Sequence, residues 1–316
     1  MAWPVDVIPA LQHWPESFPG GGFKTTARKF RKQVMDGVHA PYRFVQRQMA
    51  AQDYEPSFTS RLIQQCSIDN GTKESLSPED EEAIIWSSAS LYGAAADTTV
   101  ITLTTWTLAM IKFPEVQQRA QEEIDRVVGT DRLPNFDDRE NLPYIDAIVK
   151  EALRWWPIAA MGFPHTADEE LEYEGYHIPK GAMIMPAVWS FMHDPDVYAN
   201  PEKFDPERFL APRSEPDPCS EVFGYGRRVC PGQFFADAGL FINIAQSVAC
   251  FNISKAVGKD GKVIEPNVQS KPGVLHYPTE FQFKITPRSE KHVKIIKRLE
   301  TEVPVEGGDS HLLQLG

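Results

Sequence analysis

Apolar residues recur at helical spacing over most of the chain, and the longest such stretch is bounded by two prolines. It begins at Ser77-Pro78, where serine is a favoured N-cap residue, proline is favoured at the first helical position, and the acidic Glu79 and Asp80 suit a helix N-terminus. The pattern continues without a breaker to Phe113. A helix of roughly 35 residues spans about 50 Å at 1.5 Å per residue, so we expect the rest of the fold to pack around it.

Shorter periodic stretches flank this helix. Helical patterns cover residues 23–52, 57–67, 114–128, 143–156 and 234–242, and Pro41 is expected to break or kink the first of them. Residues 158–189 and 251–287 favour short strands, with turns at 175–181 and 258–261 and a loop at 271–274. The pattern predicts a mainly α fold with small β-sheets, of the α+β class. From residue 289 the chain is charged and then polar, and we expect a flexible tail over 289–316.

Composition narrows the possible partners. The net charge of −12 argues against nucleic acid as a partner. The four cysteines show neither the spacing of a zinc or redox site nor that of a disulfide framework, which indicates a reducing compartment with one special thiol. The N-terminus lacks the features of a secretory signal. The sequence contains no run of about 18 apolar residues, so we expect no transmembrane helix in it.

The special thiol is Cys230, which ends a glycine-bounded loop just before the 234–242 helix. Gly226 and Gly232 permit a positive φ and close approach to a flat ligand. The start of a helix favours a thiolate, and Arg228 can reach an anionic group on the same ligand. This combination favours an iron ligand in a haem site over a disulfide or a zinc site. The alternative is a buried core thiol with no ligand.

A second unusual stretch lies in the middle of the long helix. Ala94 and Ala95 remove side-chain bulk, so a flat ligand could approach the backbone there. Asp97 and Thr98 follow, and polar groups inside an apolar helix cost free energy unless they have a use. The alternative is a crossing of small residues at which Thr98 hydrogen-bonds its own helix backbone.

Two motifs resemble those of one family. The loop around the cysteine resembles the haem-binding loop of the cytochrome P450 superfamily. The spacing is matched at five positions: Phe223, Gly226, Arg228, Cys230 and Gly232. The 94–99 stretch resembles the oxygen-activation motif of the same family, with an alanine at position 95 where glycine is usual. The resemblance implies haem b as cofactor, with the cysteine as axial ligand of its iron.

The same resemblance implies roles for residues on both sides of the haem. Asp97 and Thr98 would deliver protons during oxygen activation, and Ala94 and Ala95 would lie against the cofactor. Arg228 and His165 would bind the haem propionates, although Thr166 stands where the family usually has an arginine beside this histidine. Taken alone, His165 is explained by default as a structural histidine.

A further pair of motifs concerns the stability of the fold. Glu151 and Arg154 are three residues apart on a predicted helix, an arrangement common in surface ion pairs. Residues 204–209, Phe-Asp-Pro-Glu-Arg-Phe, resemble the segment that partners this helix in the family. The resemblance implies that Glu151, Arg154 and Arg208 form a buried structural triad, and breaking one partner of such a network costs several kcal/mol.

The resemblance also places the substrate pocket. Its edge would be lined by residues of the first extended segment and closed by the 271–274 loop, and the implied lining residues are Ile158, Ala159, Ala160, Met161 and Val274. Residues 23–52 would form a pair of lid helices that rests near the lipid surface in membrane-bound relatives. The basic residues of that segment are otherwise explained as a solvated helix face.

Together these features predict a haem-thiolate monooxygenase that inserts one oxygen atom of O2 into a small apolar substrate. The chain has no nucleotide-binding glycine fingerprint, so electrons would come from NADPH through cytochrome P450 reductase. The motif spellings resemble fungal microsomal members of secondary metabolism. Such members sit at the cytoplasmic face of the endoplasmic reticulum membrane; without an anchor, a cytoplasmic location is the alternative.

The resemblance covers only the C-terminal part of the family's fold. We therefore expect an N-terminally truncated chain, with a partial cytochrome P450 domain over 1–288. Two other functions remain open. One is a haem-thiolate isomerase or dehydratase, although such enzymes tend to lack an Asp-Thr pair. The other is an inactive fragment that does not retain haem.

Overall fold

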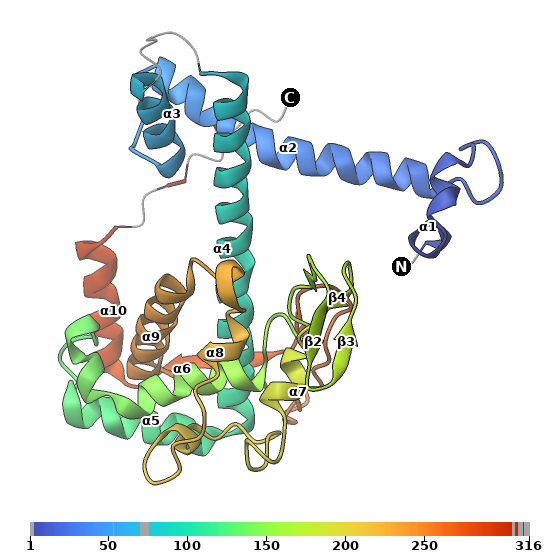
Figure 1. Cartoon of the computed structure of the whole chain (residues 1–316). Helices are drawn as coiled ribbons and strands as arrows, with labels where there is room; N and C mark the ends of the chain where they lie inside the picture. The colour runs from blue at the N-terminus through green and yellow to red at the C-terminus, as the bar shows by residue number, and fades with distance from the viewer. Residues whose placement is uncertain (1–2, 53, 70–75, 305–306, 309–311, 313–316) are drawn as a thin grey trace. The chain divides into compact units, whose positions relative to one another are not determined.

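A computed structural model describes residues 3–52, 54–69, 76–304, 307–308 and 312 (Figure 1). The described residues form two compact units, which divide between Ala94 and Ala95. The second unit runs from Ala95 to Val305, and the first holds the residues before it together with the C-terminal end. Mainly helical structure with small sheets is the class that the hydrophobic pattern predicts.

The first unit is helical. A small core joins its helices, in which Tyr42, Ile84 and Ile85 pack against partly buried residues such as Leu62. Its elements are α1 (Pro4–Val7), η1 (Pro9–His13), α2 (Phe23–Ala50), α3 (Phe58–Asp69) and the first part of α4 (Pro78–Lys112). Pro41 does not break the helix, because α2 continues through it, so the expected pair of helices over residues 23–52 is wrong.

Packing explains the continuity of α2. A proline inside a helix removes one backbone hydrogen bond. Ala40 and Tyr42, on either side of Pro41, are both buried, and their packing holds the helix through the missing bond.

Helix α4 begins and ends where the sequence pattern predicts. The Ser77 hydroxyl accepts a hydrogen bond from the Asp80 N–H at 3.1 Å and donates one to the Asp80 carboxylate at 2.7 Å. The helix stops at Lys112, because Phe113 leaves helical geometry ahead of Pro114. None of the helices in the described part of the chain is both long enough and apolar enough to cross a bilayer.

The second unit contains the main hydrophobic core. Helix α9 packs against α5 and α6, and apolar residues from the second part of α4, such as Leu108 and Met110, complete the cluster. The Glu123 carboxylate of α5 accepts hydrogen bonds from the first backbone N–H groups of α6, those of Tyr144 and Ile145, at 3.0 to 3.1 Å. The helices are α5 (Pro114–Val127), η2 (Phe136–Asn141), α6 (Pro143–Trp155), α7 (Val188–Met192), η3 (Pro206–Phe209), α8 (Cys219–Val222), η4 (Gly226–Arg228), α9 (Gln233–Cys250) and α10 (Glu290–Glu302).

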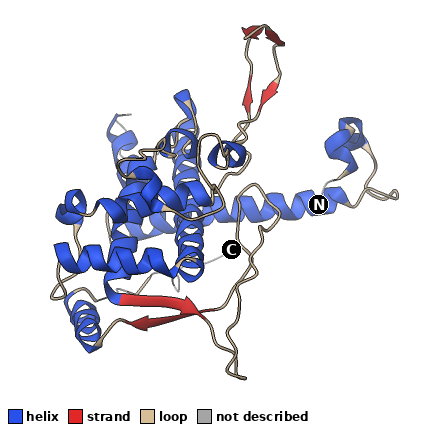
Figure 2. Cartoon of the chain, turned by 90° about the horizontal axis from the view of Figure 1, so that it is seen from below, coloured by secondary structure: helices blue, strands red, loops and turns tan. Residues whose placement is uncertain are grey.

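The described residues form three antiparallel two-stranded sheets, shown as arrows in Figure 2. The pair β2 (Leu171–Tyr173) and β3 (Tyr176–Ile178) is nested within the pair β1 (His165–Thr166) and β4 (Met183–Ile184). The third sheet pairs β5 (Phe251–Lys255) with β6 (Phe283–Pro287). The predicted turn at 175–181 is therefore two turns, because its middle residues form β3. The turn at 258–261 is confirmed by the pairing of Val257 with Val263.

The expectation of a flexible tail from residue 289 does not hold for its first part. Residues 290–302 form α10, which packs against α9 and β6. His292 and Ile295 point into the protein, at 7% and 6% exposure. The charged residues around these two buried positions, such as Lys291 and Lys294, make an amphipathic helix resemble a polar tail in the sequence. Most of the predicted tail beyond 304 lies outside the described residues.

Candidate functional site

The loop before α9 presents Cys230 as a half-buried side chain. The Cys230 N–H donates a hydrogen bond to the Phe223 carbonyl at 2.8 Å and so closes the loop. Gly224 and Gly226 have φ values of 80° and 55°, a region that favours glycine. The prediction of a positive φ at Gly232 is wrong: its φ is −91°, and it occupies the N-cap position of α9. Gly224 was not identified from the sequence.

The chemistry of this loop fits a haem better than a bare metal ion. Cys230 is a free thiol, three residues ahead of the first residue of α9. The described residues contain no group of three or more His, Cys, Asp or Glu side chains placed to hold a metal ion. A Cβ built on Gly226 would meet nothing within 4 Å, and one on Gly232 would meet only the Cys230 Sγ, at 3.9 Å. A single thiol at a helix N-terminus with open space beside it suits an axial ligand of haem iron.

Asp97 and Thr98 lie in the second unit, in α4. Asp97 is exposed, and Thr98 is half-buried. The Asp97 carboxylate faces the Tyr277 hydroxyl, and its interaction with that hydroxyl is the main reason that the pKa of Tyr277 is raised. Sequence reasoning missed Tyr277, because nothing in the pattern links two residues so far apart in the chain. Ala95, two residues before Asp97, is exposed.

The predicted pocket residues lie next to the hairpin that carries Tyr277. The His276 N–H donates to the Ile158 carbonyl at 2.7 Å, and the Trp156 indole N–H donates to the His276 carbonyl at 2.6 Å. Met161 and Val274 are 55% and 73% exposed. The structure thus brings together three predicted parts: the segment that starts at Ile158, the 271–274 loop and Asp97.

The remaining predicted site residues are dispersed. His165 is half-buried in β1, where it pairs with Ile184 of β4. Arg228 is exposed at the end of η4, two residues before the cysteine. Ala159 and Ala160 are half-buried, and the Ala160 carbonyl accepts a hydrogen bond from the Trp189 N–H at 2.8 Å. Ala94 is exposed in the part of α4 that belongs to the first unit.

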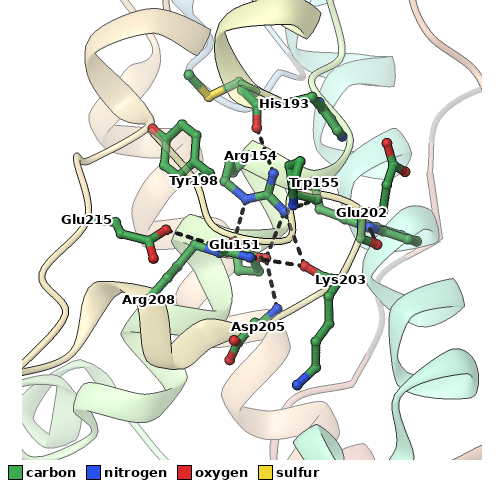
Figure 3. A network of polar contacts seen from close by, with 12 residues as sticks. Glu151, Arg154, Trp155, His193, Tyr198, Glu202, Lys203, Asp205, Arg208 and Glu215 are labelled. Carbon is green, nitrogen blue, oxygen red and sulfur yellow. Dashed lines mark hydrogen bonds and ion pairs between the residues drawn. The ribbon is translucent and has the colours of Figure 1, made fainter. Parts of the chain in front are cut away.

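Glu151, Arg154 and Arg208 meet in one fully buried network (Figure 3). The Arg154 Nε and Nη2 groups donate to the two carboxylate oxygens of Glu151 at 2.8 and 2.9 Å. The Nε of Arg208 lies 3.0 Å from the same carboxylate, which also accepts the Asp205 N–H at 2.8 Å. Burial raises the pKa of Glu151, while the two guanidinium groups act in the opposite direction.

The outer donors of this network reach the segments that follow α6. Arg154 donates to the carbonyls of Met192 and Pro201, both at 2.7 Å. Arg208 donates to the Glu215 carboxylate at 2.6 Å, and Figure 3 shows these groups converging on Glu151. Because every charged group has partners, the network fixes the chain between α7 and the cysteine loop.

Comparisons with known proteins place the chain in one family. The cytochrome P450 family model matches residues 5–285. The chain is 45% identical over 99% of its length to the multifunctional cytochrome P450 monooxygenase af510 of Aspergillus fumigatus, and equally to the cytochrome P450 monooxygenase CLM2 of Gibberella zeae. It spans 59% of the length of each. A solved zebrafish cytochrome P450 with abiraterone superposes with a TM-score of 0.61 at 32% identity, over 74% of this chain and 55% of that one. Because the family model matches most of the chain, from residue 5 to residue 285, this chain belongs to the cytochrome P450 family.

Proposed function

We propose that the chain serves as a haem-thiolate monooxygenase that inserts one oxygen atom of O2 into a small apolar substrate. The observation that carries the proposal is the free Cys230 thiol just before α9, in a loop that is closed by the hydrogen bond from the Cys230 N–H to the Phe223 carbonyl. The bound haem supplies the activation of oxygen, which a thiolate ligand favours by donating electron density. Cys230 would be its ligand, and Arg228 and His165 would neutralise its propionates.

The chain's own residues supply the thiolate environment and the protons. The free N–H groups at the start of α9 and the helix dipole stabilise the negative charge on the Cys230 sulfur. Asp97 and Thr98 would supply protons for oxygen activation, since general-acid catalysis needs a positioned proton donor. The Tyr277 hydroxyl holds the Asp97 carboxylate in place.

The pocket residues select an apolar substrate. The proposed pocket residues carry no polar side-chain atoms that could bind a charged group. They are Ile158, Ala159, Ala160, Met161 and Val274. The His276 N–H, two residues after the 271–274 loop, donates to the Ile158 carbonyl, which links the two sides of the proposed pocket edge. Burial of an apolar substrate against such walls contributes about 25 cal/mol per Å2.

The electrons require a partner. NADPH oxidation by cytochrome P450 reductase supplies them, at the cytoplasmic face of the endoplasmic reticulum membrane, where the fungal relatives are expected to work. We place the docking surface of the reductase on the cysteine side of the haem, where Arg228 is exposed.

The decisive experiment is the difference spectrum of the reduced protein with carbon monoxide after haem reconstitution. A red-shifted Soret band, as given by a thiolate ligand, supports the proposal. Cys230→Ser removes this band, whereas Cys219→Ser, a matched control at another half-buried free cysteine, retains it. A chain that gives no haem band, or a band unaffected by Cys230→Ser, contradicts the proposal.

A second experiment separates oxygen insertion from rearrangement. Product formation from an apolar substrate is measured with reductase, with and without NADPH. The proposal requires NADPH and O2, and it requires Asp97→Asn to lower the rate by about 100-fold, the lower end of the usual contribution of general-acid catalysis. NADPH-independent conversion of a peroxide would identify an isomerase or dehydratase instead.

A further inference from the structure

An ion pair holds the chain on the N-terminal side of the cysteine loop. The Lys150 ammonium of α6 lies 2.8 Å from the Asp217 carboxylate. Asp217 also accepts the Cys219 N–H at 2.9 Å, at the start of α8. Burial opposes ionisation of Asp217, but the hydrogen bonds from Lys150 and the Cys219 backbone keep its pKa lowered. Helix α8 leads directly into Phe223, whose carbonyl binds the Cys230 N–H.

A second set of ion pairs holds the C-terminal side of the same loop. Arg139, in η2, donates to both oxygens of the Asp237 carboxylate at 2.6 and 2.9 Å, and Asp237 lies in the second turn of α9. The same guanidinium donates to Asp146 of α6 at 2.6 and 3.0 Å. It also lies over the Phe241 ring, 4.9 Å from the centroid, which favours a cation.

Both sets start from one face of α6. Asp146 and Lys150 are four residues apart, so they are neighbours on the helix surface. Glu151, the next residue, is fixed by the buried arginine network, which gives this face a rigid base. Helix α6 therefore contacts the chain on either side of the cysteine loop, through α8 and through α9.

We propose that Lys150 and Arg139 are positioning residues, which set the place of the Cys230 loop by binding Asp217 on its one side and Asp237 on its other. The positioning role itself does not depend on the proposed function. Only its expected consequence, slower loss of haem from the chain, rests on that function. The side chains involved are 28% to 47% exposed. Partly exposed ion pairs contribute about 0–1 kcal/mol each to the free energy of unfolding. We therefore expect their loss to change the local stability of the cysteine loop more than the stability of the whole chain.

The first test needs no haem. Amide hydrogen exchange of the whole chain is compared between wild type, Asp217→Asn and Asp237→Asn. We expect the amides of residues 223–236 to exchange about fivefold faster in either variant, since about 1 kcal/mol less of local stability is a factor of about five. Asp237→Glu, which keeps a carboxylate for Arg139, restores slow exchange.

The matched control is Asp125→Asn. Asp125 binds Arg288 through both oxygens at 2.5 and 2.9 Å, joining α5 to the segment before α10, away from the cysteine loop. It should speed exchange around its own pair and leave residues 223–236 unchanged. Unchanged exchange of these residues in both Asp217→Asn and Asp237→Asn overturns the proposal, as does an equal acceleration over the whole second unit.

The second test uses the haem-loaded protein. Asp237→Asn and Asp217→Asn are expected to lose haem about fivefold faster to an excess of apomyoglobin, while Asp125→Asn matches wild type. If wild type binds no haem, the proposed function fails, and hydrogen exchange alone then decides the positioning role. If all the proteins lose haem at one rate while exchange differs, the loop is held by these residues but does not control the ligand, which refutes the functional half of the proposal.

Discussion

The Nε of Arg208 lies 3.0 Å from the Glu151 carboxylate, although 57 residues separate the two in sequence. Both side chains are fully buried. Bringing two charges out of water costs several kcal/mol per ion, so the contact persists only because Arg154 and the Asp205 N–H complete the partners of the carboxylate. The chain between α6 and η3 is consequently fixed in one path.

Glu151→Gln tests this network. The substitution leaves two buried guanidinium groups facing a neutral amide, and we expect the free energy of unfolding to fall by about 3–5 kcal/mol. Urea denaturation of the chain measures it. The control is Glu265→Gln, which removes the exposed pair with Lys255 and should cost about 1 kcal/mol or less. Equal effects of the two substitutions would show that burial does not govern the contribution of the network.

Local signals account for the elements that the sequence predicts well. Helix α4 has a serine N-cap, an early proline and a proline after its end, so its bounds are predicted within one residue. Helix α10 was missed, because His292 and Ile295 are its buried residues and the neighbouring Lys291, Lys294 and Lys297 suggest a solvated tail. The effect of Pro41 was also predicted wrongly, because tertiary packing determines whether a helix continues through a proline.

The two glycines of the cysteine loop should respond differently to alanine. Gly226 has a φ of 55°, where a Cβ costs about 1–2 kcal/mol, although nothing lies within 4 Å of it. Gly232 has a φ of −91°, which any residue adopts. Gly226→Ala should therefore lower the unfolding free energy of the haem-free chain by about 1–2 kcal/mol and Gly232→Ala by less. A larger loss in Gly232→Ala would mean that crowding by the cysteine sulfur, not backbone strain, limits the loop.

Stacked histidines should make the fold sensitive to acid. His193 stacks on Trp189 at 3.8 Å between ring centroids, and His276 stacks on Trp156 at 4.5 Å. Burial lowers the pKa of both histidines. The unfolded chain, with histidine pKa values of about 6.5, then takes up protons first as the pH falls. The stability they contribute is complete above about pH 6.5 and is lost progressively below it.

Urea midpoints measured from pH 8 to pH 5 test this expectation. The midpoint should fall below about pH 6.5, and the fall should be smaller in a His193→Asn, His276→Asn double variant. His13→Asn, at an exposed histidine of the first unit, serves as the control and should leave the pH dependence unchanged. A double variant with the wild-type slope would assign the acid sensitivity to other groups.

The candidate site shows where sequence reasoning stops. Cys230 and Asp97 are found from short motifs, because each has its chemistry encoded within ten residues. Tyr277 and Arg139 are not, because their partners lie in other elements and only the fold brings them together. Spacing along the chain carries no information about such contacts.

Tyr277→Phe tests whether the hydroxyl matters to Asp97. Loss of the hydroxyl that faces Asp97 frees the carboxylate to rotate, and we expect NADPH-dependent product formation by the haem-loaded chain to fall about three- to tenfold. Asp97→Asn should lower the rate further, and the double variant should be no slower than Asp97→Asn alone, since residues that act as a unit are not additive. Tyr92→Phe, at a tyrosine 75% exposed on α4, is the control and should keep the wild-type rate. If Tyr277→Phe and Asp97→Asn multiply their effects, the tyrosine acts through the substrate pocket and not through the carboxylate.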